Sequence, residues 1–466
     1  MNVLLLYPTR LDSEGRPTKY KQGFTPPLAL AVLNRLTPER HRVTIVNEIV
    51  EEIDFTASYD LVGISAMTSQ IPRAYQIADR FRAVGAKVVI GGIHGTLFPK
   101  EVKGHADAVA IGEAEPFWEN ILNDCENNQL QDFYRNPSLP DLKRLIIPKW
   151  DNMNLAIYPR VPGKKLPMMP IYTSRGCPNS CRFCCVTKAY GGAYRKKPVA
   201  NVIAEIMSVD ADFFYFVDDN IASDAEYSRD LFTEICRLDK KIYWFSAAST
   251  RILEHPDVID LAAKSGCTGL FIGIETINKD TLRDMRKGFN NVDEYGTLFG
   301  RLVAAGIVPY ISIVLGFDHD TPASINETLN YLLTIKGALA AFFVLTPLPG
   351  TELFNQMKKQ GRLLHEDWSK YDASNIVFKP KQMTADELYR SYWKIYQEFF
   401  SLLNIGKRVV YHSAKARRPV FGFIASLFFQ LMFRKATLAC EHSFCGGIGR
   451  LPSKPSSIQS SREGRS

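Results

Sequence analysis

The sequence predicts an α/β protein with two successive parallel-sheet domains: a doubly wound sheet, followed by a partial (β/α)6 barrel. Three observations predict this class. Short apolar runs alternate with helical periodicity over the first 125 residues or so, the alternation stops in a proline-rich stretch, and it resumes near residue 170. The chain of 466 residues is also longer than one hydrophobic core usually organises, so two domains are expected.

The first domain is expected over residues 1–130. Its five predicted strands are Val3–Tyr7, Val43–Asn47, Leu61–Ser65, Lys87–Ile90 and Ala108–Ile111, and its helices lie near Pro27–Leu36, Ile71–Val84 and Glu115–Asn123. Parallel strands joined by helical crossovers form a Rossmann-like sheet, which binds its ligands at the carboxyl ends of the strands.

Residues 131–168 are predicted to be a linker, because they have no sustained period and contain six prolines. The barrel is expected over residues 169–380. Its predicted strands are Ile171–Thr173, Phe213–Val217, Tyr243–Ser246, Gly269–Gly273, Tyr310–Gly316 and Ala341–Thr346, separated by helices near Val199–Ser208, Tyr227–Leu238, Val258–Lys264, Lys279–Arg286 and Ser324–Ile335. Six such repeats indicate a partial TIM barrel, with its chemistry at the strand ends.

The end of the chain is predicted to be a helical region over 381–440 and a disordered basic tail over 441–466. Eleven basic but only two acidic residues follow residue 405, so the rest of the chain is nearly neutral despite the formal charge of +8. A neutral body disfavours nucleic acid as a partner. The apolar run 419–433 lies between Arg417–Arg418 and Arg434–Lys435, and it is too short to cross a bilayer. It predicts a membrane-surface helix; a helix packed over the barrel is the alternative.

Nine cysteines in a chain of this length do not form a disulfide scaffold, and four of them fall within residues 177–185. The N-terminus lacks the basic region and the cleavage site of a signal peptide. The sequence therefore predicts a cytoplasmic protein, with association to a membrane through the C-terminal segment.

The most specific motif is Thr173-Ser-Arg-Gly-Cys177-Pro-Asn-Ser-Cys181-Arg-Phe-Cys184, directly after the first barrel strand. Three thiolates at the spacing C-x-x-x-C-x-x-C can bind three irons of a 4Fe-4S cubane and leave the fourth iron without a protein ligand. A zinc site needs four ligands, and only Cys185 is nearby, adjacent to Cys184. The spacing therefore favours a cluster.

With this motif the chain resembles the radical S-adenosylmethionine (SAM) superfamily, over nearly its whole length to about residue 380. The resemblance implies that SAM chelates the open iron and that one electron, from a donor such as flavodoxin or ferredoxin, cleaves it to methionine and a 5'-deoxyadenosyl radical. Phe183 matches the aromatic residue that lies against the adenine.

Further resemblances fall at successive strand ends. For each carboxylate there, the alternative to a cofactor-binding role is a strand-end cap or an ion pair. Asp218 and Glu275 are matched to cofactor-binding positions, with Glu275 expected to bond the ribose or methionine part of SAM. The segments Gly316-Phe-Asp-His-Asp320 and Leu345-Thr-Pro-Leu-Pro-Gly350 also look like family segments, and Asp318 has the same ion-pair alternative.

The first domain resembles the cobalamin-binding domain of the family that includes anaerobic magnesium-protoporphyrin ester cyclase and the hopanoid methylases. The matching residues at its strand ends are Ser65, Thr68, Gly91, Gly92, His94, Gly112 and Glu113. No G-x-G-x-x-G follows the first strand, which disfavours nicotinamide. No D-x-H-x-x-G is present either, so no histidine is expected on cobalt, and residues near Met67 or Gln70 would lie below the corrin ring.

These features predict a cobalamin-dependent radical SAM enzyme that methylates or oxidatively modifies an unactivated carbon of a small hydrophobic substrate, tetrapyrrole-like or lipid-like. Methyl transfer is the favoured outcome and oxidative cyclisation the other. Two alternatives stay open: a radical oxidoreductase whose first domain is a vestigial substrate lid, and a non-enzymatic corrinoid or iron-sulfur sensor.

Overall fold

The computed structural model describes residues 1–160, 163–415, 419–442 and 447–451 and divides the chain into two compact units. The first unit contains Met1–Pro140, Ile146–Pro159 and the described residues from 447 onward. The second contains Asp141–Leu145 and the described residues between 160 and 442.

The first unit is built on a sheet of six parallel strands in the order β3-β1-β4-β5-β6-β7. Their bounds are β1 Asn2–Tyr7, β3 Arg42–Asn47, β4 Leu61–Ser65, β5 Lys87–Gly91, β6 Ala108–Ile111 and β7 Phe133–Arg135. Four-residue runs such as Val3–Leu6 in β1 are completely buried because helices cover both faces of the sheet. This is the predicted doubly wound architecture.

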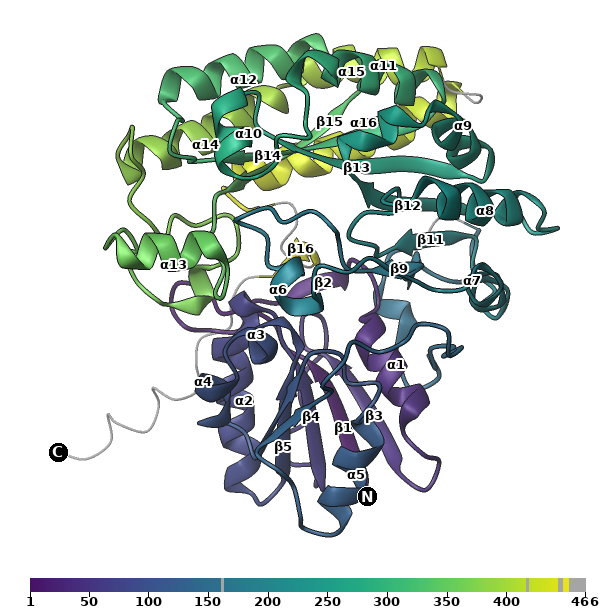
Figure 1. The fold of residues 1–466 in the computed structure, drawn as a ribbon, viewed down its shortest axis with the longest axis vertical. Helices are drawn as coiled ribbons and strands as arrows, with labels where there is room; N and C mark the ends of the chain where they lie inside the picture. Colours follow the sequence, from purple (N-terminus) through teal and green to yellow (C-terminus); the bar gives the residue numbers. More distant parts are fainter. Residues whose placement is uncertain (161–162, 416–418, 443–446, 452–466) are drawn as a thin grey trace. The chain divides into compact units, whose positions relative to one another are not determined.

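Helices α1 (Leu28–Leu36) and α5 (Trp118–Glu126) contribute to one core beside the strands, where Trp118 and Leu30 pack with Leu5 and Leu61. Helix α2 (Ile71–Ala83) packs on β4 and β5, and the short helices α3 (Gly92–Leu97) and α4 (Pro99–Lys103) follow β5 (Figure 1). Because all six strands are parallel, their carboxyl ends lie at one edge of the sheet.

Two segments differ from the predicted boundaries. The expected linker at 131–168 begins with β7, whose residues Phe133–Arg135 pair with β6 as an edge strand; three residues are too short to give a readable period. The expected disordered tail contains β16 (Gly447–Arg450), which pairs antiparallel with β2 (Tyr20–Gly23). The rest of the predicted tail, from 452, lies outside the described residues.

The second unit has six parallel strands in the order β15-β14-β13-β12-β11-β8. Their bounds are β8 Met169–Ile171, β11 Phe213–Phe216, β12 Tyr243–Ala248, β13 Cys267–Glu275, β14 Val308–Leu315 and β15 Leu339–Val344. Each strand pairs with its neighbours in chain order, as in a (β/α)6 partial barrel, so the predicted fold class is confirmed.

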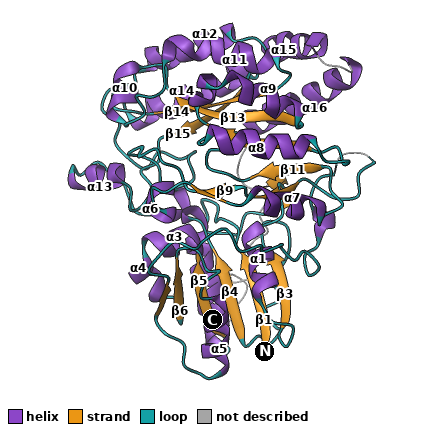
Figure 2. Cartoon of the chain, turned by 45° about the vertical axis from the view of Figure 1, so that its right-hand side comes forward, coloured by secondary structure: helices purple, strands orange, loops and turns teal. Residues whose placement is uncertain are grey.

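Helices connect these strands. The connecting helices are α6 Val186–Tyr190, α7 Val199–Met207, α8 Ala225–Cys236, α9 Pro256–Lys264, α10 Lys279–Asp284, α11 Tyr295–Ala304 and α12 Pro322–Thr334, and α13 Glu352–Lys359 follows the last strand. Figure 2 shows α8, α9, α11 and α12 beside the sheet. A two-stranded hairpin of β9 (Ser174–Arg175) and β10 (Arg195–Lys196) follows β8. The residues between its strands include the cysteine motif.

The second unit ends in α14 (Ala385–Phe399), α15 (Leu402–Lys415) and α16 (Pro419–Leu438). Helix α14 begins with a capping box of Thr384 and Glu387 and buries Tyr392 and Tyr396 near Phe342 of β15. Within the described residues, no helix is long and apolar enough to cross a membrane.

Candidate active site

The cysteine loop begins where β8 ends, at the carboxyl edge of the second sheet. Gly176 has a positive φ of 83°, and a side chain there would collide with the carbonyl oxygen of Ala193. Its backbone N–H donates to Oδ2 of Asp219 over 3.0 Å. Glycine is therefore required for the turn that carries the chain into Cys177.

Asp218, after β11, holds the strand that leads into this loop. Its carboxylate accepts hydrogen bonds from the backbone N–H and the hydroxyl of Thr173, at 3.1 and 2.9 Å, and from both the N–H and the hydroxyl of Ser174. Burial raises the pKa of Asp218 to about 6, although these donors favour its charged form. Asp218 thus forms the strand-end cap; a direct contact with a cofactor stays a prediction.

Arg182, between the second and third cysteines, ties the loop to two distant segments. Its Nε donates to Glu352 of α13 over 2.9 Å, and Nη1 donates to the carbonyl of Asp284 over 3.0 Å. Backbone bonds from Arg182 N–H to Met285 and from Leu353 N–H to Arg182 complete the attachment. The sequence analysis missed this residue, because its partners are more than 100 positions away.

The thiols of Cys177, Cys181 and Cys184 share one charged neighbour. Burial raises the pKa of all three, that of Cys184 to about 12, while the ammonium of Lys287 opposes the rise at each. Burial raises the pKa of Cys185 to about 11, and Asp219 raises the pKa of both Cys185 and Cys177. What distinguishes the three motif cysteines from Cys185 is therefore their shared cation, Lys287.

The donor set fits an iron-sulfur cluster. Among the described residues, no group of three or more Cys, His, Asp or Glu side chains already stands close enough to hold a metal ion. The fit rests instead on three half-buried, free cysteines in one loop beside a buried cation, which offsets the negative charge that thiolate ligands bring.

Lys287 forms a buried ion pair with Glu275, the last residue of β13. Lys287 Nζ lies 2.6 Å from Glu275 Oε1, and Ser312 of β14 donates to Oε2 over 3.0 Å. Glu275 has a φ of 63°, where the register between β13 and β14 shifts. A Cβ on Gly273 would lie 2.5 Å from Glu275 Oε1, so the Gly-Ile-Glu motif provides the space for this pair.

Phe183 lies at the same edge, 6.1 Å from Phe317 between ring centroids and 5.9 Å from Lys287 Nζ. The structure thus brings Phe183, Glu275 and the three cysteines together around Lys287, which sequence reasoning did not single out.

Asp318 forms ion pairs with Arg362 at 2.8 Å and with Lys381 at 2.7 Å, which is the alternative role that the sequence offered for it.

Asp320 should make the stability of the second unit pH-dependent. Its buried carboxylate accepts from the N–H groups of Gly316 and Phe317 at 2.8 and 3.0 Å, and burial raises its pKa to about 6. Between about pH 4 and pH 6 the folded carboxyl still holds a proton that the unfolded one has released. The free energy of unfolding therefore falls as the pH rises through this window, by up to about 3 kcal/mol.

The Asp320→Asn variant should lack this part of the slope in urea unfolding measured from pH 4 to pH 7. Asp318→Asn is the matched control: Asp318 is partly buried, but Arg362 and Lys381 outweigh burial and lower its pKa. Any slope that Asp318 contributes therefore lies below about pH 4, and this variant should keep the wild-type slope from pH 4 to pH 7. An unchanged slope in Asp320→Asn would contradict the assignment.

In the first unit, Ser65 ends β4, and the segment that follows carries Met67, Thr68 and Gln70. Gln70 accepts from the N–H of Met67 over 2.9 Å and donates to the carbonyl of Pro8 over 2.7 Å. Met67 is left 47% exposed, whereas Thr68 and Gln70 are buried. Of the residues predicted to lie below a corrin ring, Met67 is thus the accessible one.

His94, in α3, is completely buried. Its Nδ1 lies 3.4 Å from the hydroxyl of Thr68, and its Nε2 lies 3.5 Å from Glu101. The imidazole supports Thr68 from inside the domain, and a direct contact between His94 and a bound nucleotide would require the side chain to move. That contact stays a prediction.

Of the three glycines at these strand ends, Gly91 and Gly92 pack against the domain itself and Gly112 leaves open space. Gly92 has a φ of 90°, and a Cβ there would lie 2.6 Å from the carbonyl oxygen of Ala66, so only glycine fits beside Gly91. Gly112, with a φ of 85°, has open space where a Cβ would point, and its N–H is held by Thr96 at 2.9 Å. Glu113 follows, partly exposed.

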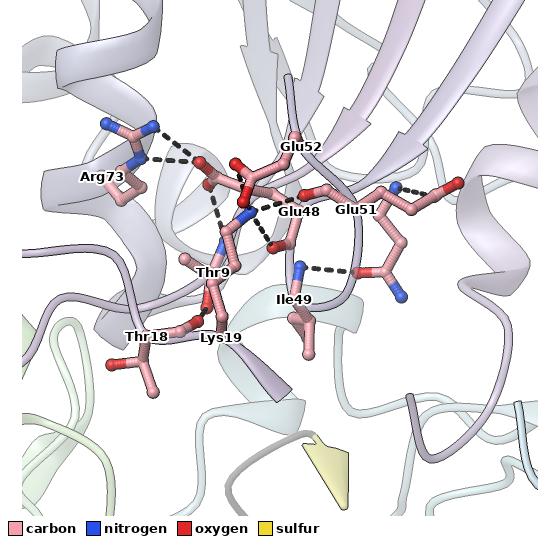
Figure 3. Close-up of polar contacts among 9 residues, drawn as sticks. Thr9, Thr18, Lys19, Glu48, Ile49, Glu51, Glu52 and Arg73 are labelled. Carbon is pink, nitrogen blue, oxygen red and sulfur yellow. Dashed lines mark hydrogen bonds and ion pairs between the residues drawn. The ribbon is translucent and has the colours of Figure 1, made fainter. Parts of the chain in front are cut away.

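A buried polar cluster orders the loops after β1 and β3 (Figure 3). Glu48 accepts two bonds from Arg73 of α2, at 2.9 and 2.6 Å, and one from the N–H of Thr9 at 3.1 Å. Lys19 donates to the carbonyl of Glu48 over 2.8 Å and to that of Glu51. These contacts fix the loops at the strand ends, where a doubly wound sheet binds its ligand.

Cobalt is predicted to lack a histidine ligand in this protein. In the cobalt(II) form, electron paramagnetic resonance should show no nitrogen hyperfine splitting, because His94 is buried beneath Thr68. The His94→Ala spectrum should be the same. Splitting that disappears in His94→Ala would contradict the prediction.

The fold and the site define a radical SAM enzyme with a corrinoid-binding domain, and comparisons with known proteins agree. The Radical SAM superfamily model matches residues 171–332 and the B12 binding domain model matches residues 22–122. A domain of unknown function (DUF4070) matches residues 351–432.

Curated relatives extend over both domains. Bacteriochlorophyllide d C-12(1)-methyltransferase of Chlorobaculum tepidum is 30% identical over 82% of this chain and 84% of its own length. The C-8(2)-methyltransferase of the same organism is 29% identical over 83% and 88%. Anaerobic magnesium-protoporphyrin IX monomethyl ester cyclase of Rubrivivax gelatinosus is 25% identical over 75% and 67%.

Two solved structures share the fold. The radical SAM methyltransferase TsrM of Kitasatospora setae, solved with cobalamin and a [4Fe-4S] cluster, has a TM-score of 0.65 at 16% identity over 93% of this chain and 99% of its own. The cobalamin-dependent radical SAM enzyme OxsB has a TM-score of 0.63 at 13% identity over 93% and 72%.

The chain belongs to the family of cobalamin-dependent radical SAM methyltransferases and cyclases. It is an enzyme, and its cofactors are a 4Fe-4S cluster, SAM and cobalamin. The enzyme interpretation of the sequence is confirmed over that of a sensor.

Proposed function

We propose that this enzyme transfers a methyl group to an unactivated carbon of a tetrapyrrole related to bacteriochlorophyllide. The observation that carries the proposal is the match with the bacteriochlorophyllide d C-12(1)-methyltransferase, which extends through both the corrinoid and the radical SAM domain. A substrate of this kind agrees with the predicted hydrophobic, tetrapyrrole-like class.

Cys177, Cys181 and Cys184 would hold the cluster, and the iron without a cysteine would take the amine and carboxylate of SAM. When bound, the cluster supplies the electron that cleaves SAM, and cobalamin supplies a methyl carrier. Phe183 would lie against the adenine, and Glu275 would bond the ribose or methionine part. Asp218 and Arg182 position the cysteine loop, so their contribution is to hold the three thiols at one edge of the sheet.

In the first domain we propose that the cofactor's nucleotide passes Gly91, Gly92 and Gly112; of these, Gly112 has open space where a Cβ would point, whereas Gly91 and Gly92 pack against Ala110 and Ala66. Ser65, Thr68 and Glu113 would supply polar contacts. Met67, the exposed residue of this loop, would lie below the ring.

Oxidative cyclisation is the second candidate, because magnesium-protoporphyrin ester cyclases from two organisms are among the relatives, at 24–25% identity. The electron donor is proposed to be a flavodoxin or ferredoxin, which carries the single electron that SAM cleavage needs. A peripheral contact with a membrane is proposed for the C-terminal helices, since tetrapyrroles of this kind are apolar.

Product analysis of SAM tests the proposal. The protein is reconstituted anaerobically with iron, sulfide and hydroxocobalamin, then incubated with SAM, a reductant and a bacteriochlorophyllide-type chlorin. Methyl transfer yields S-adenosylhomocysteine together with 5'-deoxyadenosine and a chlorin heavier by one methylene. Deoxyadenosine alone, with an oxidised chlorin, would replace methyl transfer by the cyclase reaction, and an unmodified chlorin would reject the substrate class.

A further inference from the structure

The outer faces of α15 and α16 are apolar, although both helices lie at the surface of the second unit. Leu402, Leu403 and Val410 of α15 and Phe428, Leu431 and Leu438 of α16 are between 40% and 70% exposed. On α16 the exposed positions 428, 431, 435 and 438 recur every three or four residues, so they share one face.

The inner side of the helix hairpin formed by α15 and α16 is mixed, because the apolar Ile405 and Val409 are buried there beside polar side chains. Arg408 is buried; its Nε donates to Oε1 of Gln430 over 2.7 Å and its Nη2 to the carbonyl of Phe399 over 2.8 Å. Arg434 donates to the carbonyl of Phe400 over 3.0 Å. Gln430 and Thr437 are also buried. A helix that faces water normally keeps its large apolar side chains on the inner side, whereas this hairpin also carries six of them on its outer face.

We propose that these outer faces dock on the surface of an anionic lipid bilayer. Lys407 lies in line with Leu403 and Val410, and Lys435 in line with Leu431 and Leu438, both exposed. Neither helix contains an aspartate or glutamate. Apolar side chains flanked by unopposed lysines suit shallow insertion among anionic headgroups.

A second copy of the chain fits this surface less well. A twofold contact through the hairpin would bring the lysines of both copies together, with no acidic residue on either helix to pair with them. Binding to a bilayer also rests on the proposed function, because an enzyme held there would meet an apolar tetrapyrrole where that substrate partitions. The hairpin overlaps the domain of unknown function at 351–432, so the proposal gives that domain a role in membrane binding.

Cosedimentation of the reconstituted full-length enzyme with vesicles tests the proposal. Vesicles of phosphatidylglycerol and phosphatidylcholine are compared with vesicles of phosphatidylcholine alone, at low and high salt. We expect binding to the anionic vesicles at low salt and at least a tenfold weaker binding of the double variant Leu431→Glu, Leu438→Glu. The matched control is Leu333→Glu, Leu364→Glu, which alters two leucines of similar exposure outside the hairpin and should bind as the wild type does.

Cluster content and SAM cleavage without vesicles check that each variant is folded. Equal binding by the hairpin and control variants, or no binding of the wild type to anionic vesicles, would overturn the proposal. Self-association in sedimentation velocity that only the hairpin variant loses would assign the surface to a second copy instead. Methylation of a detergent-dispersed chlorin is measured in parallel, so a failure of docking is distinguishable from a failure of the proposed function.

Discussion

Replacing Cys177, Cys181 or Cys184 by alanine is expected to abolish the 4Fe-4S cluster and all reductive cleavage of SAM. In the proposed assignment each thiolate would bind a different iron of the cubane, and the neighbouring Cys185 directly follows Cys184 and would not take the place of a missing ligand. The visible absorbance of the anaerobically reconstituted variants and their yield of 5'-deoxyadenosine measure the effect.

Cys185→Ala is the matched control, because Cys185 is adjacent to Cys184 and equally free. Lys287 favours the thiolate at the three motif cysteines and is not among the charges that act on Cys185. Cys185→Ala should keep both cluster and cleavage. A full 4Fe-4S signal in Cys181→Ala would show that the ligand assignment is wrong.

Lys287→Met is expected to destabilise the second unit by about 3–5 kcal/mol, because it leaves the carboxylate of Glu275 buried without its cation. The two side chains are each about 10% exposed and 2.6 Å apart. Urea unfolding of the apo-protein, followed by the fluorescence of the second unit's tryptophans, measures the loss.

The double variant Lys287→Met, Glu275→Met tests whether the destabilisation comes from the unpaired charge of Glu275 or from lost packing around Lys287. Since it removes both charges, most of the stability should return. Cluster assembly should still be impaired, because the cation beside the thiols is gone. A double variant as unstable as Lys287→Met would mean that the destabilisation comes from packing rather than from an unpaired charge.

The sequence predicted the strands well because most are continuous apolar runs that a parallel sheet buries on both faces. Leu61–Ser65 matches β4 at both ends, and Lys87–Ile90 falls one residue short of β5. The missed elements lack such a signal. Strand β7 has three residues, of which only Tyr134 is buried, and β2 and β16 are held by pairing between distant segments.

The candidate site was predictable where its residues are adjacent in the chain. The C-x-x-x-C-x-x-C spacing located the loop, but its attachment through Arg182 and the Glu275–Lys287 pair depends on contacts that only folding creates. Lys287 follows a short helix and has no pattern of its own. The sequence located Asp218 and His94 at strand ends. It did not predict that Thr173 and Ser174 hydrogen-bond Asp218, or that His94 contacts the hydroxyl of Thr68.

The central claim is that this one chain holds both an iron-sulfur cluster on three cysteines and a corrinoid in its first domain. Iron, sulfide and cobalt determined on one anaerobically reconstituted preparation test it most directly. We predict about four iron, about four sulfide and about one cobalt per chain, with Cys181→Ala losing the iron and sulfide but keeping the cobalt. A wild-type protein that takes up no cobalt, or a Cys181→Ala variant that keeps its full iron content, would contradict the account.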